Sequence, residues 1–144
     1  MIISKKKPMV YGSKTDRILY YEVFDDGYGI MVKNIQGSHP CGYVRLPDEI
    51  AVKVMEADPK YCEESIWIDA DIHGGITFSG FMGDFAGYFI RWDYAHYGDY
   101  TWTGYDHLFG NRQDEKRWTT DEVIEEAKLV VEALRDGKYE IEGA

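Results

Sequence analysis

The fold of this chain is decided by residues 18–33, ILYYEVFDDGYGIMVK. Two runs rich in β-branched and aromatic residues, Ile18–Phe24 and Tyr28–Lys33, stand on either side of Asp25-Asp26-Gly27. Such runs favour the pleated strand, and an Asp-Gly step between two of them is typical of a hairpin turn. The stretch therefore predicts two antiparallel strands at the start of a sheet.

Further runs extend the predicted sheet along the chain. The run Ser65–Ile72 alternates apolar and polar residues with a period of two, so Asp69, Asp71 and His73 are expected on one face. The other expected strands are Cys41–Leu46, Gly75–Ser79, Gly87–Asp93 and an edge strand at Tyr139–Glu142.

Two helices are expected beside the strands. The first begins at residues 47–49, PDE, because proline and acidic side chains suit the first turn, and it ends before residues 58–59, DP. The second begins with Thr119 and Glu122, spaced as a capping box, and Gly137 can end it. Its apolar stripe is Val123, Ala127, Val130, Val131 and Leu134. These elements predict a single α+β domain over residues 1–144, an antiparallel sheet of about five to seven strands flanked by two helices.

Composition and charge restrict the function classes. The 144 residues include 26 acidic and 16 basic side chains, a formal net charge of −10. This field repels nucleic acid, so generic nucleic-acid binding is not expected, and the acidic excess serves solubility or mimics nucleic acid toward a basic partner. No run approaches the roughly 20 apolar residues of a membrane span, and no signal peptide is recognisable. With only Cys41 and Cys62, no disulfide framework is expected, so we expect a cytoplasmic protein without a membrane partner.

Polar residues and glycines gather in two segments, residues 69–80 and 91–99. Polar side chains on a central strand need partners. We therefore expect the segments to meet, with the imidazoles of His73 and His96 facing one cleft. The candidate ligand-binding residues are Asp71, His73, Gly74, Gly75, Thr77, Ser79, Arg91, Asp93, His96 and Asp99.

Two kinds of catalytic chemistry fit these residue types. Asp71, His73, Asp93 and His96 supply oxygen and imidazole ligands for the metal ion of a hydrolase, although their spacing matches no established metal motif. Ser79 with either histidine and an aspartate supplies the residue types of a nucleophilic triad, but outside a GxSxG context. We therefore expect no metal or other cofactor and assign no catalytic residue.

Ligand binding without turnover is the favoured interpretation. Glycine N–H groups in turns suit a phosphate or another anion, and Arg45 or Arg91 would hold its charge against the net field of the protein. Aromatic side chains would stack on a base. These features predict a small, anionic, nucleotide-like ligand.

An irregular stretch, residues 98–118, holds the aromatic residues Trp102, Tyr105 and Phe109. Long irregular stretches in compact domains usually have a functional or partner-binding role. Exposed aromatics of this number would form a large apolar patch on a monomer. We expect the stretch to pack against a second copy of the chain in a homo-oligomer.

Three motifs in order carry a resemblance to a known family. They are GYV at residues 42–44, IHGGITFSG at residues 72–80 and WDYAHYGD at residues 92–99. With these motifs the chain, over roughly Tyr28 to Leu134, resembles a family of small uncharacterised proteins carried by bacteriophages and prophages. Tyr94 stands where the family pattern has cysteine, and Arg91 departs from an expected glycine, so no thiol-dependent role is expected.

The resemblance implies a phage-type accessory protein in the host cytoplasm. Such a protein would bind, and sequester, a nucleotide-like signal to counter host defence. Two alternatives stay open: a metal-dependent hydrolase of a similar ligand, and an acidic protein that blocks a host factor.

Overall fold

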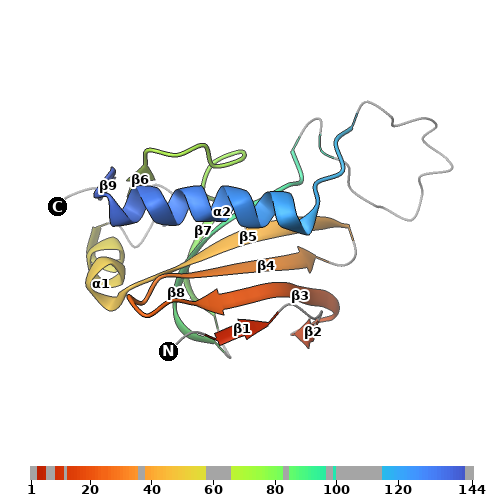
Figure 1. Ribbon diagram of the computed structural model, residues 1–144, viewed down its shortest axis with the longest axis horizontal. Helices are drawn as coiled ribbons and strands as arrows, with labels where there is room; N and C mark the ends of the chain where they lie inside the picture. The colour runs from red at the N-terminus through yellow and green to blue at the C-terminus, as the bar shows by residue number, and fades with distance from the viewer. Residues whose placement is uncertain are drawn as a thin grey trace, which may run out of the picture.

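The computed structural model of the protein describes residues 3–5, 9–11, 13–35, 38–57, 66–82, 85–96, 99 and 115–141. In this part of the chain, strands and two helices form an α+β fold, as the sequence predicts (Figure 1). No helix in these ranges has the length and apolar character needed to cross a membrane.

Seven strands form the main sheet of the described residues, and every paired strand runs antiparallel to its neighbour. The order is β1-β3-β4-β5-β8-β7, and β2 pairs with β3 beside β1. The strands are β1 (Ile3–Lys5), β2 (Met9–Tyr11), β3 (Ser13–Val23), β4 (Gly29–Ile35), β5 (His39–Leu46), β7 (Phe78–Met82) and β8 (Phe85–Asp93).

The predicted hairpin joins β3 to β4. The backbone N–H of Phe24 donates to the carbonyl of Tyr28 at 2.8 Å, and that of Gly27 donates to Phe24 at 3.1 Å. Gly27 has a φ of +90°, a conformation that glycine adopts without the steric cost of a Cβ. The turn chemistry therefore sets this register, as expected.

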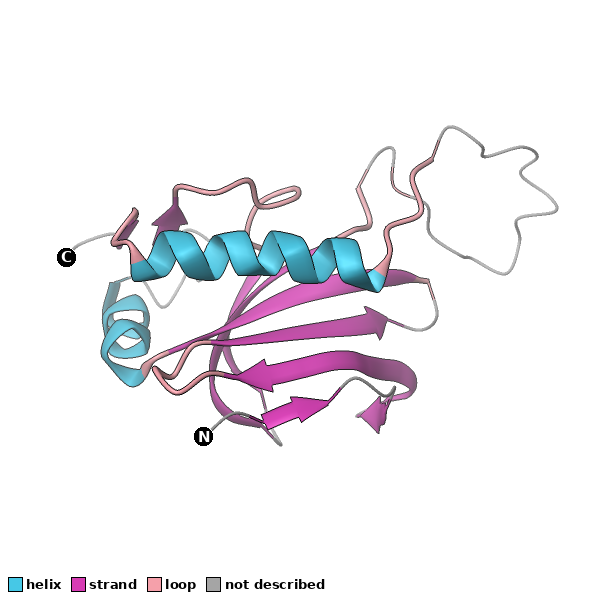
Figure 2. Cartoon of the chain, in the orientation of Figure 1, coloured by secondary structure: helices cyan, strands magenta, loops and turns pink. Residues whose placement is uncertain are grey.

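Helix α2 (Thr120–Arg135) crosses one face of the sheet (Figure 2), and its apolar stripe is buried against β3, β4 and β5. Its capping box is present: the N–H of Glu122 donates to the Thr119 hydroxyl at 3.2 Å, and the N–H of Thr119 donates to the Glu122 carboxylate at 3.0 Å. Helix α1 (Asp48–Ala57) follows β5 and buries Ala51 and Val54. Both predicted helices are confirmed.

The predicted strand Ser65–Ile72 is wrong beyond Ile68. Strand β6 spans only Ile66–Ile68 and pairs with β9 (Tyr139–Ile141) in a separate two-stranded sheet. After Ile68 the chain bends, because the N–H of Ala70 donates to the Ile68 carbonyl at 2.9 Å. The aspartates and the histidine that follow therefore lie in a loop and share no strand face. Ser65 is outside the described residues.

The next two predicted strands exist with different limits. Strand β7 begins at Phe78, three residues later than expected, and continues to Met82. Strand β8 begins at Phe85, two residues earlier than expected, and ends at Asp93 as predicted. The expected contact of Trp102, Tyr105 and Phe109 with a second copy falls outside the described residues.

The two faces of the main sheet carry two separate apolar clusters. Trp92 and Tyr94 belong to the cluster beneath α2, whereas Phe89 belongs to a smaller cluster on the opposite face. On that opposite face the ring of Tyr21 lies 5.2 Å from Phe85 and 6.4 Å from Phe89, between ring centroids. Because β4 and β5 separate β3 from β8, these contacts require a strongly curved sheet that is concave on this side. We call this side of the sheet, which carries Tyr21 and Phe89, the concave face.

Candidate functional site

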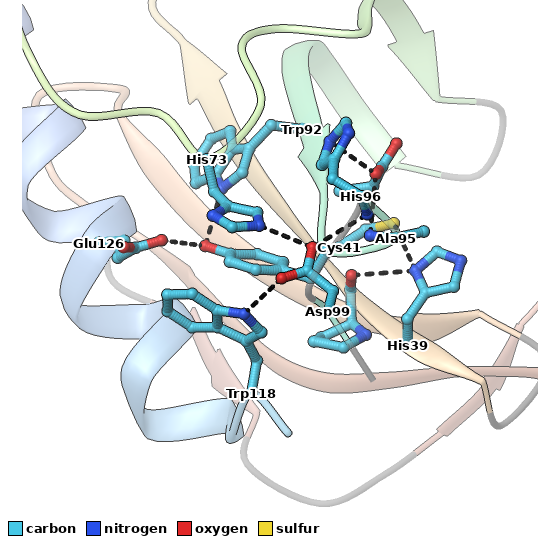
Figure 3. A network of polar contacts seen from close by, with 12 residues as sticks. His39, Cys41, His73, Trp92, Ala95, His96, Asp99, Trp118 and Glu126 are labelled. Atoms are coloured by element: carbon cyan, nitrogen blue, oxygen red, sulfur yellow. Dashed lines mark hydrogen bonds and ion pairs between the residues drawn. The ribbon is translucent and has the colours of Figure 1, made fainter. Parts of the chain in front are cut away.

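Asp99 is the centre of the candidate site, and its side chain is only 4% exposed. Its Oδ2 accepts from the His73 ring at 2.7 Å and from the backbone N–H of His96 at 3.0 Å (Figure 3). Its Oδ1 accepts from the indole N–H of Trp118 at 2.9 Å. The buried carboxylate is therefore satisfied by three donors from three segments.

These donors decide the ionisation of Asp99. Burial alone would raise its pKa, but the hydrogen bonds from the His96 backbone, His73 and Trp118 outweigh burial and hold the pKa below the usual value. An ionised carboxylate only accepts hydrogen bonds, so Nε2 of His73 carries a hydrogen, and this is the single N–H of the ring in its neutral form. Nδ1 of His73 is then the ring nitrogen with a free lone pair.

Aromatic rings surround His73 and hold its orientation. Its ring stacks on Tyr94 at 4.8 Å between centroids, with an interplanar angle of 10°. The Trp118 ring lies 4.9 Å away and is tilted against it. The His73 side chain remains 25% exposed, so solvent or a ligand can reach it.

The expectation that His73 and His96 lie close together is confirmed, since their ring centroids are 5.6 Å apart. Gly74 permits this arrangement. A Cβ at Gly74 would lie 2.1 Å from Nε2 of His96, and Gly74 also has a φ of +70°. The same His96 nitrogen is 3.1 Å from the Asp93 carboxylate, although the angle does not suit a hydrogen bond. Gly74 therefore contributes space for His96.

A hydrogen-bonded chain fixes Tyr94 beneath the site. The Trp92 indole donates to the Tyr94 hydroxyl at 2.9 Å, and this hydroxyl donates to Glu126 of α2. Burial, then the bond to Glu126, raises the pKa of Tyr94, so the phenol stays protonated. Gly42 of the GYV motif lets Trp92 in, because a Cβ there would lie 2.6 Å from the indole ring. The chain links the site to helix α2.

The loop residues of the predicted site are used unequally. Asp71 and Thr77 are exposed, and the Thr77 N–H donates to the Arg91 carbonyl at 2.8 Å. The N–H of Gly75 donates to the Ile72 carbonyl at 2.9 Å, so it is engaged within the turn.

Ser79 is buried, and its hydroxyl accepts from the Tyr88 hydroxyl at 3.3 Å. A hydroxyl held in this way beneath the surface is poorly placed to act as the nucleophile of a triad.

Neither arginine proposed for this site points into it. Arg91 alternates with Trp92 along β8 and lies on the concave face, where its guanidinium is 5.5 Å from the Phe78 ring centroid. Arg45 donates to the carbonyls of Ala86, at 3.0 Å, and of Gly27. The expectation that one of these arginines joins His73 in a single site is therefore wrong. Arg91 lies on the other face of the sheet because side chains alternate along a strand, and Arg45 is hydrogen-bonded to the backbone of two turns.

Sequence reasoning missed four residues that form the site. Tyr94 and Trp118 supply its rings, Glu126 anchors Tyr94, and Lys116 has its Nζ 3.8 Å from the Trp118 ring centroid. The dipeptide Lys116-Arg117 directly before a tryptophan in a strongly acidic chain was the available signal. The motifs that contain His73 and His96 gave no indication of this lysine.

Metal-ligand geometry is not found in the described ranges, where no three His, Cys, Asp or Glu side chains converge as a metal site would require. Fold and site together define an α+β protein with a buried, hydrogen-bonded Asp–His pair lined by aromatic rings. The chain matches no protein-family model, and no curated protein or solved structure shows significant similarity to it.

Proposed function

We propose that the chain binds a small, anionic, nucleotide-like ligand at the end of the sheet where His73 and His96 meet. The observation that carries the proposal is the bond from His73 to buried Asp99. This bond fixes the tautomer of His73 and leaves Nδ1 to accept a hydrogen bond from a ligand. Bases and sugars of nucleotides present N–H and O–H donors of this kind.

Aromatic surroundings suit the flat part of such a ligand. The three rings of this cluster contact one another at centroid distances of 4.8–4.9 Å; they belong to His73, Tyr94 and Trp118. A ligand that packs against any one of these rings therefore meets a ring held in place by the other two. A supported ring loses little conformational entropy when a base packs against it.

Lys116 supplies the charge for the anionic part. Its ammonium group lies over Trp118 and pairs with Glu122 at 2.8 Å, and both charged side chains are well exposed. An exposed pair of this type contributes little stability, so a phosphate can replace Glu122 at small cost. The ligand then spans from Lys116 to His73.

In a phage-type accessory protein, this binding removes a nucleotide-like signal from the host cytoplasm and counters host defence. Sequestration leaves the ligand unchanged, so heat release returns the molecule that was added. An altered molecule after release, or one equivalent of metal that His73→Ala removes, favours the alternative of a metal-dependent hydrolase.

The test is a thermal-shift screen of linear and cyclic mono- and dinucleotides, followed by NMR of the imidazole resonances with any hit. Binding at a hundredfold excess over Kd stabilises the fold by about 2.7 kcal/mol, and the His73 resonances should move with saturation. Lys116→Gln should weaken binding. The matched control is Lys128→Gln, because Lys128 also pairs with a helix glutamate, at 3.3 Å, away from Trp118.

Besides an altered ligand or a stoichiometric metal, two results would overturn the proposal. One is a complete screen without a shift, which favours the acidic protein that blocks a host factor. The other is equal weakening by both lysine substitutions, which indicates general electrostatics in place of a site.

A further inference from the structure

The concave face carries a second group of polar side chains, separate from the His73 site. Lys33 of β4, Tyr43 of β5 and Arg91 of β8 lie in neighbouring positions there, since Lys33 pairs with Cys41 and Tyr43 pairs with Arg91. Lys33 is only 9% exposed. Two cations thus enter a largely apolar face.

Tyr43 lies between the two cations. The Nζ of Lys33 is 5.7 Å from the Tyr43 ring centroid, and the hydroxyl of Tyr43 is hydrogen-bonded to the Arg91 guanidinium. Burial raises the pKa of Tyr43 to about 12, so the phenol is neutral and does not compensate the positive charge of Arg91.

Arg91 has a donor without an acceptor. Its Nε is buried and has no hydrogen-bond partner in the described part of the chain. A buried donor left unsatisfied is costly, so such a group is uncommon without a ligand, an ion or water. Nε and the neighbouring Nη of a guanidinium form a fork that matches two oxygens of one oxyanion.

Electrostatics around the pair favour an anion as well. Burial lowers the pKa of Lys33, whereas Asp16 and Cys41 act to raise it. The charge of Arg91 lowers the pKa of Lys33 further, because the two cations repel each other. Among the described residues, Asp93 and His39 also lie near these groups. Asp93 accepts from the Ala95 N–H at 3.2 Å and lies 3.1 Å from His96, and its negative charge also acts on Arg91.

We propose that the concave face binds one phosphate group at Arg91, with Lys33 and Tyr43 beside it. The fork of Arg91, including Nε, donates to two phosphate oxygens, and Lys33 supplies the second positive charge. The phosphate is either a free anion or part of a nucleotide, and it occupies a different face from the ligand at His73.

The test follows the Nε–Hε resonance of Arg91 by NMR while inorganic phosphate, or separately adenosine monophosphate, is added to the full chain. Inorganic phosphate should move this resonance with saturation. Movement with adenosine monophosphate alone also supports the site and assigns the phosphate to a nucleotide. No movement with either, or movement only at the His73 imidazole, overturns the proposal.

Substitutions provide an independent measurement. Arg91→Gln should weaken phosphate binding roughly tenfold to a hundredfold, as expected for lost hydrogen bonds to a charged group, and Lys33→Gln should weaken it less. Arg17→Gln is the matched control, because Arg17 is exposed and alternates with Ile18 to the other face of the sheet. Equal binding by Arg91→Gln and the wild type would also contradict the site, and the wild-type titration decides if Arg91→Gln does not fold.

Discussion

At the scale of single residues, the candidate site depends on a contact between a glycine and a histidine ring. Gly74 and Gly75 both have positive φ, +70° and +83°, but only Gly74 touches His96. A Cβ at Gly75 meets nothing within 4 Å. A comparison of substitutions at the two glycines therefore separates the cost of backbone strain from the cost of contact with His96.

We expect Gly74→Ala to destabilise the protein more than Gly75→Ala. Each substitution adds strain of roughly 1–2 kcal/mol at a positive φ, and Gly74→Ala also displaces the His96 ring, which adds roughly 1–3 kcal/mol. Urea unfolding of both variants measures the difference. Equal free energies of unfolding would show that His96 does not rest on Gly74.

Asp99 gives a prediction for pH dependence. Its folded pKa lies below the unfolded value of about 3.9, so its stabilising effect is present above that value and is lost as pH falls through the folded pKa. Asp99→Asn removes this titration. We expect the variant to be less stable by roughly 1–3 kcal/mol at neutral pH, with a flatter loss of stability in acid.

Denaturant unfolding at several pH values between neutrality and acid tests this prediction. Asp121→Asn, an exposed acid in the first turn of α2, serves as the control. Parallel pH profiles for Asp99→Asn and the wild type would contradict the ionised, hydrogen-bonded Asp99.

At the scale of elements, helix α2 begins where the site ends. The Thr119 hydroxyl accepts from the Glu122 N–H and closes the capping box one residue after Trp118. We expect Thr119→Ala to cost about 1 kcal/mol, because one N-terminal N–H loses its acceptor. Thr120→Ala, inside the first turn, should be nearly neutral, and thermal unfolding of both compares them. A neutral Thr119→Ala would mean that water replaces the cap.

The sequence predicted those elements whose signals are local. Residues 25–27 define the hairpin turn, and Thr119 and Glu122 define the start of α2. The strand at Ser65–Ile72 failed because alternation cannot show what a strand pairs with. Here, within the described ranges, β9, far along the chain, pairs with Ile66–Ile68, and the next N–H, of Asp69, donates to Lys138.

The candidate site was predictable only in part, because residue types show which side chains need partners but not how the elements pack. The approach of His73 to His96 was predicted from polar segments that need partners, whereas the bond between His73 and Asp99 was found only in the structure. The orientation of Arg91 depends on which face of β8 meets α2. Tyr94 and Trp118 are aromatic residues of the kind that fill a core, so their residue types alone did not mark them as site residues. These features require the tertiary packing.

At the scale of the whole molecule, the net charge of −10 opposes the compact state. Salt screens this repulsion, with a Debye length of about 10 Å at 0.1 M. We expect Tm to rise by a few degrees between low salt and about 0.5 M NaCl. Differential scanning calorimetry measures this, with an uncharged osmolyte at equal osmolarity as the control. A falling Tm would mean that ion pairs such as Arg135–Asp26, at 2.7 Å, outweigh the repulsion.

The pairing of β6 with β9 has a consequence for biosynthesis. Ribosomes deliver the chain from the N-terminus, so Ile66 and Ile68 leave the exit tunnel before β9, their described strand partner, has been translated. In that interval the loop that bears His73 lacks its anchor at Lys138, and Trp118 and α2 are also still to come. Assembly of the site is therefore a late event on the ribosome, and a stalled nascent chain exposes two isoleucines to chaperones.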